Sequence, residues 1–113
     1  MSEFDYDLIV IGAGSGGTRT ARISASYGAK TLVVEGDRAG GTCVLRGCVP
    51  KKLLVYASQF SEQVSDAEGF CWQVSSFESN WNELIKKKNK ELDRLHEIYA
   101  VSYTHLTLPT MLM

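Results

Sequence analysis

Residues 7–35 read DLIVIGAGSGGTRTARISASYGAKTLVVE, and this stretch decides the fold. Residues 7–11 are a short apolar run of the kind that forms a buried parallel strand. Residues 16–27 place two alanines four positions apart, which lets a helix pack closely on that strand, and residues 31–35 supply a second strand. A strand, a helix and a strand within about 30 residues predict a βαβ unit.

The turn between the first strand and the helix carries the pattern G-x-G-x-x-G at Gly12, Gly14 and Gly17. Glycine there permits a tight turn, close approach of a pyrophosphate and close helix packing, and the helix N-terminus favours phosphate. Glu35 ends the second strand where an acidic side chain accepts hydrogen bonds from a ribose 2′-hydroxyl, and it would repel a 2′-phosphate. The pattern therefore predicts a site for NAD or FAD rather than NADP, with a glycine turn that binds nothing as the alternative.

Two cysteines, Cys43 and Cys48, lie five positions apart just after this unit. A single pair lacks the further ligands that a structural zinc site needs, so no metal site is predicted. Two buried, unreactive thiols are the better alternative. Arg46, Lys51 and the start of a following helix favour thiolate, so the pattern indicates redox chemistry in which one sulfur attacks a disulfide and the other resolves the mixed disulfide.

Two longer helices are expected after the cysteines. Pro50 suits the first turn of one, and apolar residues follow it at helical spacing. The other should begin near Ser79 or Asn80 and end near Tyr99, with an apolar stripe and Glu–Lys pairs at i, i+4. Between them, residues 70–75 alternate apolar and polar side chains and indicate a short extended piece, in which Cys71 fits a buried small hydrophobe.

The composition is typical of one soluble globular domain, with 113 residues of which 44% are hydrophobic and 22% charged. A net charge of −1 favours neither nucleic acid nor an anionic membrane as a partner, and the lysines at 86–88 fit a solvated helix face. No apolar run approaches the roughly 20 residues of a membrane span. The N-terminus is acidic where a secretory signal would be basic, and three cysteines are too few for a secreted disulfide framework, so a cytoplasmic location is expected.

The cysteine segment resembles a known family. Residues 40–52 read GGTCVLRGCVPKK and, with LLVYAS after them, resemble the active-site segment of the glutathione reductases among the FAD-dependent disulfide reductases. The related lipoamide dehydrogenases usually carry Ile-Pro-Ser-Lys where residues 49–52 here are Val-Pro-Lys-Lys. The resemblance runs from Tyr6 to about Tyr99. It implies an α/β fold over residues 1–100, namely the N-terminal part of a Rossmann-like FAD-binding domain with an incomplete sheet.

The resemblance also implies roles for individual residues. Cys43 would attack glutathione disulfide, and Cys48 would be the charge-transfer thiol beneath the flavin. Lys51 would lie beside the reactive edge of the flavin and stabilise negative charge on the reduced ring. The implied FAD contacts are Gly12, Gly14, Ser15, Gly16, Gly17, Glu35, Thr42, Cys43 and Lys51. The implied glutathione contacts are Ser15, Arg22 and Tyr99, of which the last two equally fit a solvated arginine and a tyrosine that closes an apolar stripe.

The implied activity is reduction of glutathione disulfide by NADPH, through FAD and a Cys43–Cys48 redox disulfide, in a homodimeric enzyme. The family's NADPH and dimerisation domains have no counterpart here, and neither His96 nor His105 matches the catalytic histidine that the family carries near its C-terminus. The alternatives are another flavin-dependent disulfide or mercuric reductase, and a noncatalytic FAD-binding redox module.

Residues 101–113 fit neither a helix nor a strand pattern. Residues 101–110 read VSYTHLTLPT and resemble one reading frame of a transposon-end sequencing adaptor, so 101–113 are expected to be a non-native tail. A sheet that has only its first two strands leaves edges and apolar faces uncovered. We therefore expect marginal stability and no NADPH-dependent turnover from the isolated chain.

Overall fold

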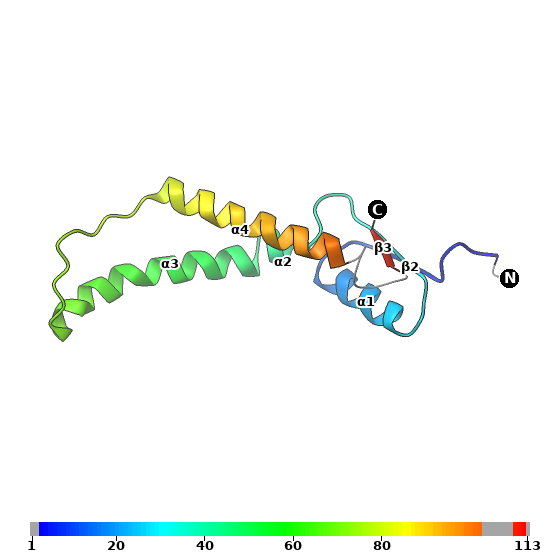
Figure 1. The fold of residues 1–113 in the computed structure, drawn as a ribbon, viewed down its shortest axis with the longest axis horizontal. Coiled ribbons are helices and arrows are strands. Elements are labelled where there is room, and N and C mark those ends of the chain that lie inside the picture. Colours follow the sequence, from blue (N-terminus) through cyan, green and yellow to red (C-terminus); the bar gives the residue numbers. More distant parts are fainter. Residues whose placement is uncertain (1–2, 103–109, 113) are drawn as a thin grey trace.

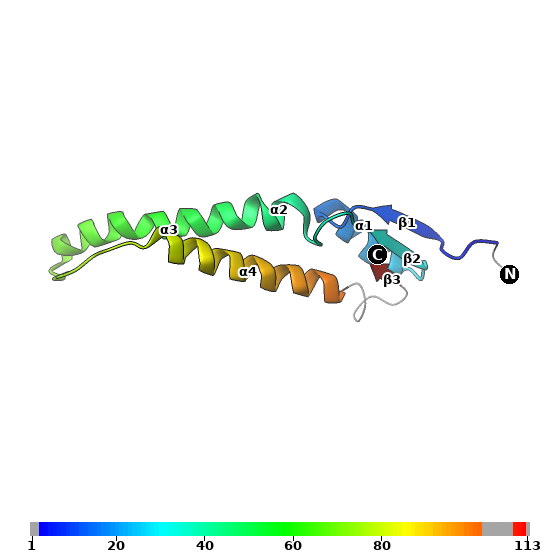
Figure 2. The same cartoon turned by 90° about the horizontal axis from the view of Figure 1, so that it is seen from above.

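The computed structural model describes residues 3–102 and 110–112 as a small α/β unit from which a long helical hairpin projects (Figure 1). The molecule measures 74 × 25 × 19 Å, and the hairpin lies along the longest dimension (Figure 2). Among the described residues, none of the helices combines the length and the apolar character needed to cross a membrane. In chain order, the elements are β1 (Leu8–Ile11), α1 (Ser15–Ser26), β2 (Thr31–Val34), α2 (Gly41–Leu45), α3 (Cys48–Ala67), the 3-10 helix η1 (Glu68–Phe70), α4 (Trp81–Val101) and β3 (Thr110–Leu112).

The three strands form one parallel sheet in the order β1-β2-β3. β1 and β2 pair in register, from Leu8 opposite Thr31 to Ile11 opposite Val34. Because parallel neighbours need a crossover connection, α1 lies between them in the chain. This arrangement confirms the predicted βαβ unit and the α/β class, as the partial Rossmann-like domain that the sequence indicates.

The third strand differs from the sequence prediction of two strands. β3 pairs with β2, Thr110 lying opposite Thr31. Three residues are too few to show the alternation that identifies a strand, which is why the sequence pattern did not indicate β3. Residues 103–109 and 113 lie outside the described part of the chain, and the non-native origin of residues 101–113 stays a prediction.

The core is small and includes the inner face of the sheet and one side of α1. Val10 and Val33 of the strands form a buried cluster with Ala21 of the helix, whose small side chain lets α1 lie close to the sheet as predicted. The other face of β1 is uncovered, since the side chains of Ile9 and Ile11 are 56% and 88% exposed. This uncovered face agrees with the expected incomplete sheet.

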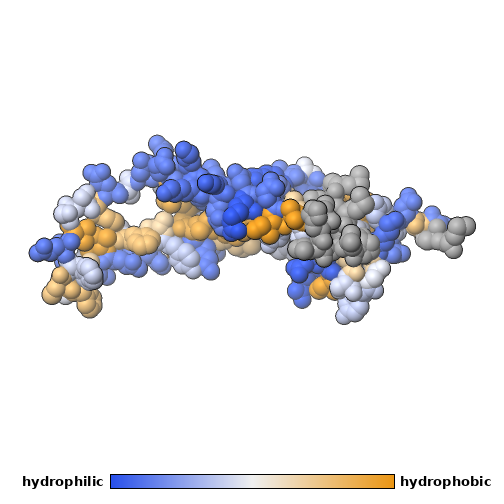
Figure 3. Space-filling view, viewed as in Figure 1, coloured by the Kyte–Doolittle hydropathy of each residue, from blue (hydrophilic) through white to orange (hydrophobic). Residues whose placement is uncertain are grey.

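The hairpin consists of α3 and α4, which lie side by side in both views (Figures 1 and 2). Asn80 caps α4 by accepting a hydrogen bond from the Glu83 backbone N–H at 3.1 Å, which confirms the predicted start of that helix. Apolar side chains remain exposed on the surface of the hairpin (Figure 3). Phe60, Phe77 and Trp81 line a groove of about 650 Å³ between the helices. Two helices without a third layer leave such side chains partly exposed.

The prediction of an extended piece at residues 70–75 is wrong. The structure has η1, a turn and irregular chain there, because the described strands lie at the other end of the molecule and none is beside this segment to pair with it. The prediction that Cys71 is buried is also wrong. Cys71 follows η1 near the tip of the hairpin and is exposed, because little of the chain surrounds that tip.

Candidate functional site

The glycine turn joins β1 to α1 through a very close backbone contact. A Cβ atom on Gly17 would lie 1.8 Å from the carbonyl oxygen of Gly12 and 3.4 Å from Cγ1 of Val10. The N-cap of α1 is Gly14, which has no side chain to occupy the amides of the first helical turn. These amides and the positive end of the helix dipole suit an anionic group such as a pyrophosphate.

Glu35 brings a carboxylate to the same turn. One of its oxygens accepts a hydrogen bond from the backbone N–H of Ala13 at 2.6 Å, and the other accepts from the N–H of Asp37 at 3.2 Å. Glu35 directly follows β2, whose last residue, Val34, accepts a hydrogen bond from Gly12 N–H at 2.7 Å. The acidic group and the glycine turn are thus brought together as the sequence predicts, and contact with a ribose stays a prediction.

A short helix that the sequence did not predict, α2, attaches the cysteine segment to this turn. The Gly40 N–H donates to the Ala13 carbonyl at 2.8 Å. A Cβ atom on Gly41 would lie 2.6 Å from Cα of Gly14, and Gly41 has a φ of +68°, in the left-handed region that favours glycine. The adjacent glycines at 40 and 41 indicate that another backbone segment comes close, but they do not indicate which segment it is.

The predicted cysteine pair comes together from two different helices. Cys43 lies on α2 and is half-buried, Cys48 is the exposed first residue of α3, and both are free thiols. A hydrogen bond from the Cys48 thiol lowers the pKa of Cys43 below its ordinary value, and the Cys48 backbone N–H, the Ser15 hydroxyl and the Lys51 ammonium act in the same direction. The same thiol–thiol hydrogen bond, with the adjacent negative charge on Cys43, raises the pKa of Cys48. Cys43 is therefore the more easily ionised sulfur.

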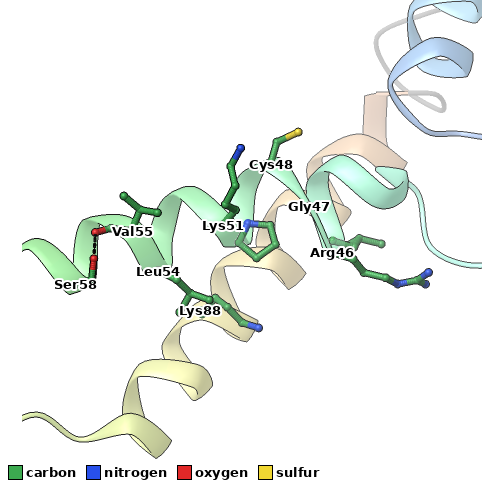
Figure 4. A pocket seen from close by; sticks show the side chains of 10 residues that line it. Arg46, Gly47, Cys48, Lys51, Leu54, Val55, Ser58 and Lys88 are labelled. Atoms are coloured by element: carbon green, nitrogen blue, oxygen red, sulfur yellow. Dashed lines mark hydrogen bonds between the residues drawn. The ribbon is translucent and has the colours of Figure 1, made fainter.

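Lys51 lies one helical turn beyond Cys48 on α3, and the two side chains point to the same side of that helix (Figure 4). A groove of about 950 Å³ adjoins Cys48 and is also lined by Arg46 and by Lys88 of α4. Lys88 is half-buried, so the prediction that the lysine run is a solvated face is wrong at this position, because α3 packs beside it. A basic lining favours an anionic ligand.

The remaining predicted contacts are not joined to the cysteine pair. Arg22 is exposed on α1, and Tyr99 is half-buried against the core cluster that contains Val10 and Ala21. Within residues 3–102, neither side chain hydrogen-bonds to Cys43 or Cys48. The packing of Tyr99 favours the alternative in which it closes the apolar stripe of α4. The glutathione contacts of both residues stay predictions.

Thr42 and Gly16, two of the predicted FAD contacts, are exposed on the first turns of α2 and α1. His96 is half-buried, and its Nδ1 lies 3.0 Å from the carbonyl oxygen of Ala39, so the ring joins α4 to the chain that leads into α2. His105 lies outside the described residues. Among the residues that are described, no group of three His, Cys, Asp or Glu side chains is placed to hold a metal ion.

Two ion pairs that sequence reasoning missed hold the loop before α2. Arg38 contacts Asp93 of α4 at 2.6 Å, and Arg46 pairs with Asp37. Their partners lie far apart in sequence or outside any helix, so the i, i+4 rule gives no signal for them. Asp37, Arg46 and Asp93 are exposed and Arg38 is partly exposed, and we therefore assign these pairs a role in orientation rather than in stability.

Comparison with known proteins gives the family. A profile of the pyridine nucleotide-disulphide oxidoreductases matches residues 6–108. The chain belongs to the pyridine nucleotide-disulphide oxidoreductases. This match extends into residues 101–113, the segment predicted to be non-native.

Among the curated relatives of this chain are three proteins named as glutathione reductases. The relative from Burkholderia cepacia is 54% identical over 99 residues, which cover 88% of this chain and 22% of the relative. The relative from Nostoc sp. is 54% identical over 96 residues, which cover 85% of this chain and 21% of the relative. The chloroplastic/mitochondrial protein of Pisum sativum is 47% identical over 108 residues, covering 86% and 20%. The chain thus spans about a fifth of the length of these relatives.

The pKa directions of Cys43 and Cys48 predict unequal reactivity of the two thiols. Because the thiolate is the nucleophile, the lowered pKa keeps Cys43 reactive until the pH falls through that lowered value, whereas the raised pKa leaves Cys48 a thiol until the pH rises above the ordinary thiol range. With the reduced chain and iodoacetamide at neutral pH, we expect labelling of Cys43 to be roughly fivefold to tenfold faster than that of Cys48. Peptide mass spectrometry measures both rates, and faster labelling of Cys48 would contradict the assignment.

Proposed function

We propose that residues 3–102 form the flavin-binding and disulfide part of a glutathione reductase. The observation that carries this proposal is a pair of neighbouring thiols, Cys43 and Cys48, which shift each other's pKa and lie on a segment attached to a glycine turn of the dinucleotide-binding type. The names of the three relatives support glutathione disulfide as the substrate. NADPH is the proposed source of electrons, and a homodimer is the proposed assembly, as the family resemblance implies.

FAD is the dinucleotide we propose for the glycine turn. The uncapped amides after Gly14 suit its pyrophosphate, and the Glu35 carboxylate beside Ala13 suits a ribose hydroxyl. When bound, a flavin supplies the electron pair that reduces a neighbouring disulfide. For this chain's residues, we propose that Ser15, Gly16 and Thr42 contact the cofactor and that Lys51 compensates negative charge at its ring.

The proposed exchange begins at Cys43. Its thiolate attacks one sulfur of glutathione disulfide, forming a mixed disulfide while the first glutathione leaves as a thiolate and takes up a proton. Cys48 then loses its proton and attacks the Cys43 sulfur, which forms the Cys43–Cys48 bond and releases the second glutathione. Two electrons pass from the pair to the substrate. The order of the two pKa values suits this sequence, since Cys43 ionises first.

A cytoplasmic location accompanies this proposal. It is supported by the acidic N-terminus, where a secretory signal would be basic, and by the small number of cysteines.

A chimera tests the proposed function. Residues 3–102 would replace the matching part of the Burkholderia cepacia relative, with which the chain shares 54% identity over 99 residues. We expect the purified chimera to contain FAD, seen in its absorption spectrum, and to oxidise NADPH only when glutathione disulfide is added. The matched control carries Cys48→Ser, which should retain flavin and lose turnover.

The alternatives give different results in the same assay. Oxidation of NADPH with mercuric ion but not with glutathione disulfide would favour a mercuric reductase. A chimera that binds FAD but turns over neither substrate would favour a noncatalytic redox module and would contradict the proposed function.

A further inference from the structure

Ser15 and Cys43 are brought together by the contact between two glycines. Ser15 directly follows Gly14 as the first residue of α1, and Cys43 lies two residues beyond Gly41 on α2. The backbones of the two glycines approach so closely that a Cβ atom on Gly41 would lie 2.6 Å from Cα of Gly14. At this junction, the Ser15 hydroxyl lies close enough to the Cys43 thiol to act as a donor that lowers its pKa.

We infer that Ser15 is a positioning residue for the attacking thiol of Cys43. The Ser15 hydroxyl holds the Cys43 sulfur at the N-terminus of α1. This inference rests on the proposed function, in which Cys43 is the nucleophile. The N-cap position of α1 is occupied by Gly14, so the Ser15 hydroxyl does not cap the helix. The sulfur is thereby held near the positive end of the α1 dipole, which favours a thiolate.

The Ser15 hydroxyl differs in one respect from the other donor side chain at Cys43. The Cys48 thiol gives up its proton when it attacks the mixed disulfide, so its hydrogen bond is lost during the exchange. The Ser15 hydroxyl keeps its proton throughout. When electrons later reduce the Cys43–Cys48 bond, one sulfur leaves as the Cys43 thiolate, and Ser15 stabilises this leaving group with a hydrogen bond.

The charged and titratable groups that act on Cys43 are Cys48 and Lys51, both on α3. From α4, Lys88 and Asp93 lie beside Leu45, at the end of α2, and neither is among the groups that act on the sulfur. Substitution of Ser15 therefore removes one donor and leaves the charges around Cys43 unchanged.

The test compares three single variants of the 113-residue chain. Each reduced protein is labelled with iodoacetamide over a range of pH, and the rate at Cys43 is measured by peptide mass spectrometry. Ser15→Ala should slow labelling at neutral pH by about threefold to tenfold, the factor that one ordinary hydrogen bond represents, and should move the profile to higher pH. Ser15→Thr keeps a hydroxyl and should restore the profile.

Ser26→Ala is the matched control, because Ser26 ends the same helix and its hydroxyl donates to the Ile23 carbonyl at 2.6 Å. It should leave the profile unchanged. If Ser15→Ala disturbed the structure, the labelling rate of Cys43 at the alkaline plateau of the pH profile would change. Loss of the hydrogen bond instead moves the midpoint of that profile to higher pH.

An unmoved midpoint in Ser15→Ala, or a failure of Ser15→Thr to restore it, would overturn the inference. The labelling needs neither FAD nor NADPH. Failure of the chimera to reduce glutathione disulfide would therefore leave this result standing, and failure of the labelling test would leave the proposed function standing.

Discussion

Replacement of Gly17 by alanine is expected to unfold the βαβ unit and abolish dinucleotide binding. The added methyl group would lie 1.8 Å from the Gly12 carbonyl oxygen, a backbone atom that no side-chain rotation can move away. Relief requires α1 to separate from β1, which opens the core around Val10 and Ala21. We expect a loss of about 3 kcal/mol or more in the free energy of unfolding, which exceeds what a marginally stable chain can lose.

Gly16→Ala is the control for this substitution. It makes the same chemical change one residue earlier in the same helical turn, where a Cβ atom meets nothing within 4 Å. We expect it to be neutral or to stabilise the helix by up to about 1 kcal/mol. Urea unfolding followed by circular dichroism measures both variants, and equal midpoints for Gly17→Ala and Gly16→Ala would show that the turn tolerates a side chain.

Replacement of Cys48 by serine is expected to trap glutathione on Cys43. In a Cys71→Ser background, which removes the other exposed thiol, Cys43 should attack glutathione disulfide and stop at the mixed disulfide because no second thiol resolves it. Intact-mass spectrometry should show one glutathionyl group on nearly every chain. When Cys48 is present, the same treatment should give the internal disulfide and no added glutathione.

The reciprocal variant separates the roles of the two sulfurs. Cys43→Ser in the same background leaves Cys48, whose pKa is raised by its hydrogen bond to Cys43 and by the adjacent negative charge. Both causes disappear with Cys43, and the Cys48 backbone N–H and Lys51 still favour a Cys48 thiolate. Cys48 has no counterpart of the Ser15 hydroxyl, so we expect it to react more slowly than Cys43 at neutral pH. Equal rates of glutathionylation would contradict the assignment of Cys43 as the attacking thiol.

Features that depend on short stretches of sequence were predictable. The apolar run before Gly12, the glycine pattern and the small residues of α1 led to β1, α1 and β2, because each signal lies within one element. Asn80 similarly marked the start of α4. In contrast, β3 is too short to show a period, and the position of Cys71 depends on where the tip of the hairpin lies relative to the rest of the chain.

The sequence indicated which residues belong to the candidate site, but it did not indicate the contacts between them, and their roles stay predictions. The spacing of Cys43 and Cys48 indicated a redox pair, but which sulfur ionises first depends on donors from other elements, such as Ser15. The contact between Gly14 and Gly41 likewise joins segments that are separated in sequence. Side-chain patterns predict which face of a helix or strand is buried, but they do not indicate which backbone segments contact each other.

The joining of α2 to the glycine turn has a thermodynamic consequence. Because Gly40 is hydrogen-bonded to Ala13 and Gly41 contacts Gly14, a ligand that orders the turn also restricts the chain that leads to Cys43. Ligand affinity and the equilibrium between dithiol and disulfide are then linked. If the turn binds its ligand more tightly in one oxidation state, the ligand must stabilise that state by the same free energy. Through the contacts of Gly40 and Gly41, ligand binding at the turn and oxidation of the thiols would each shift the equilibrium of the other.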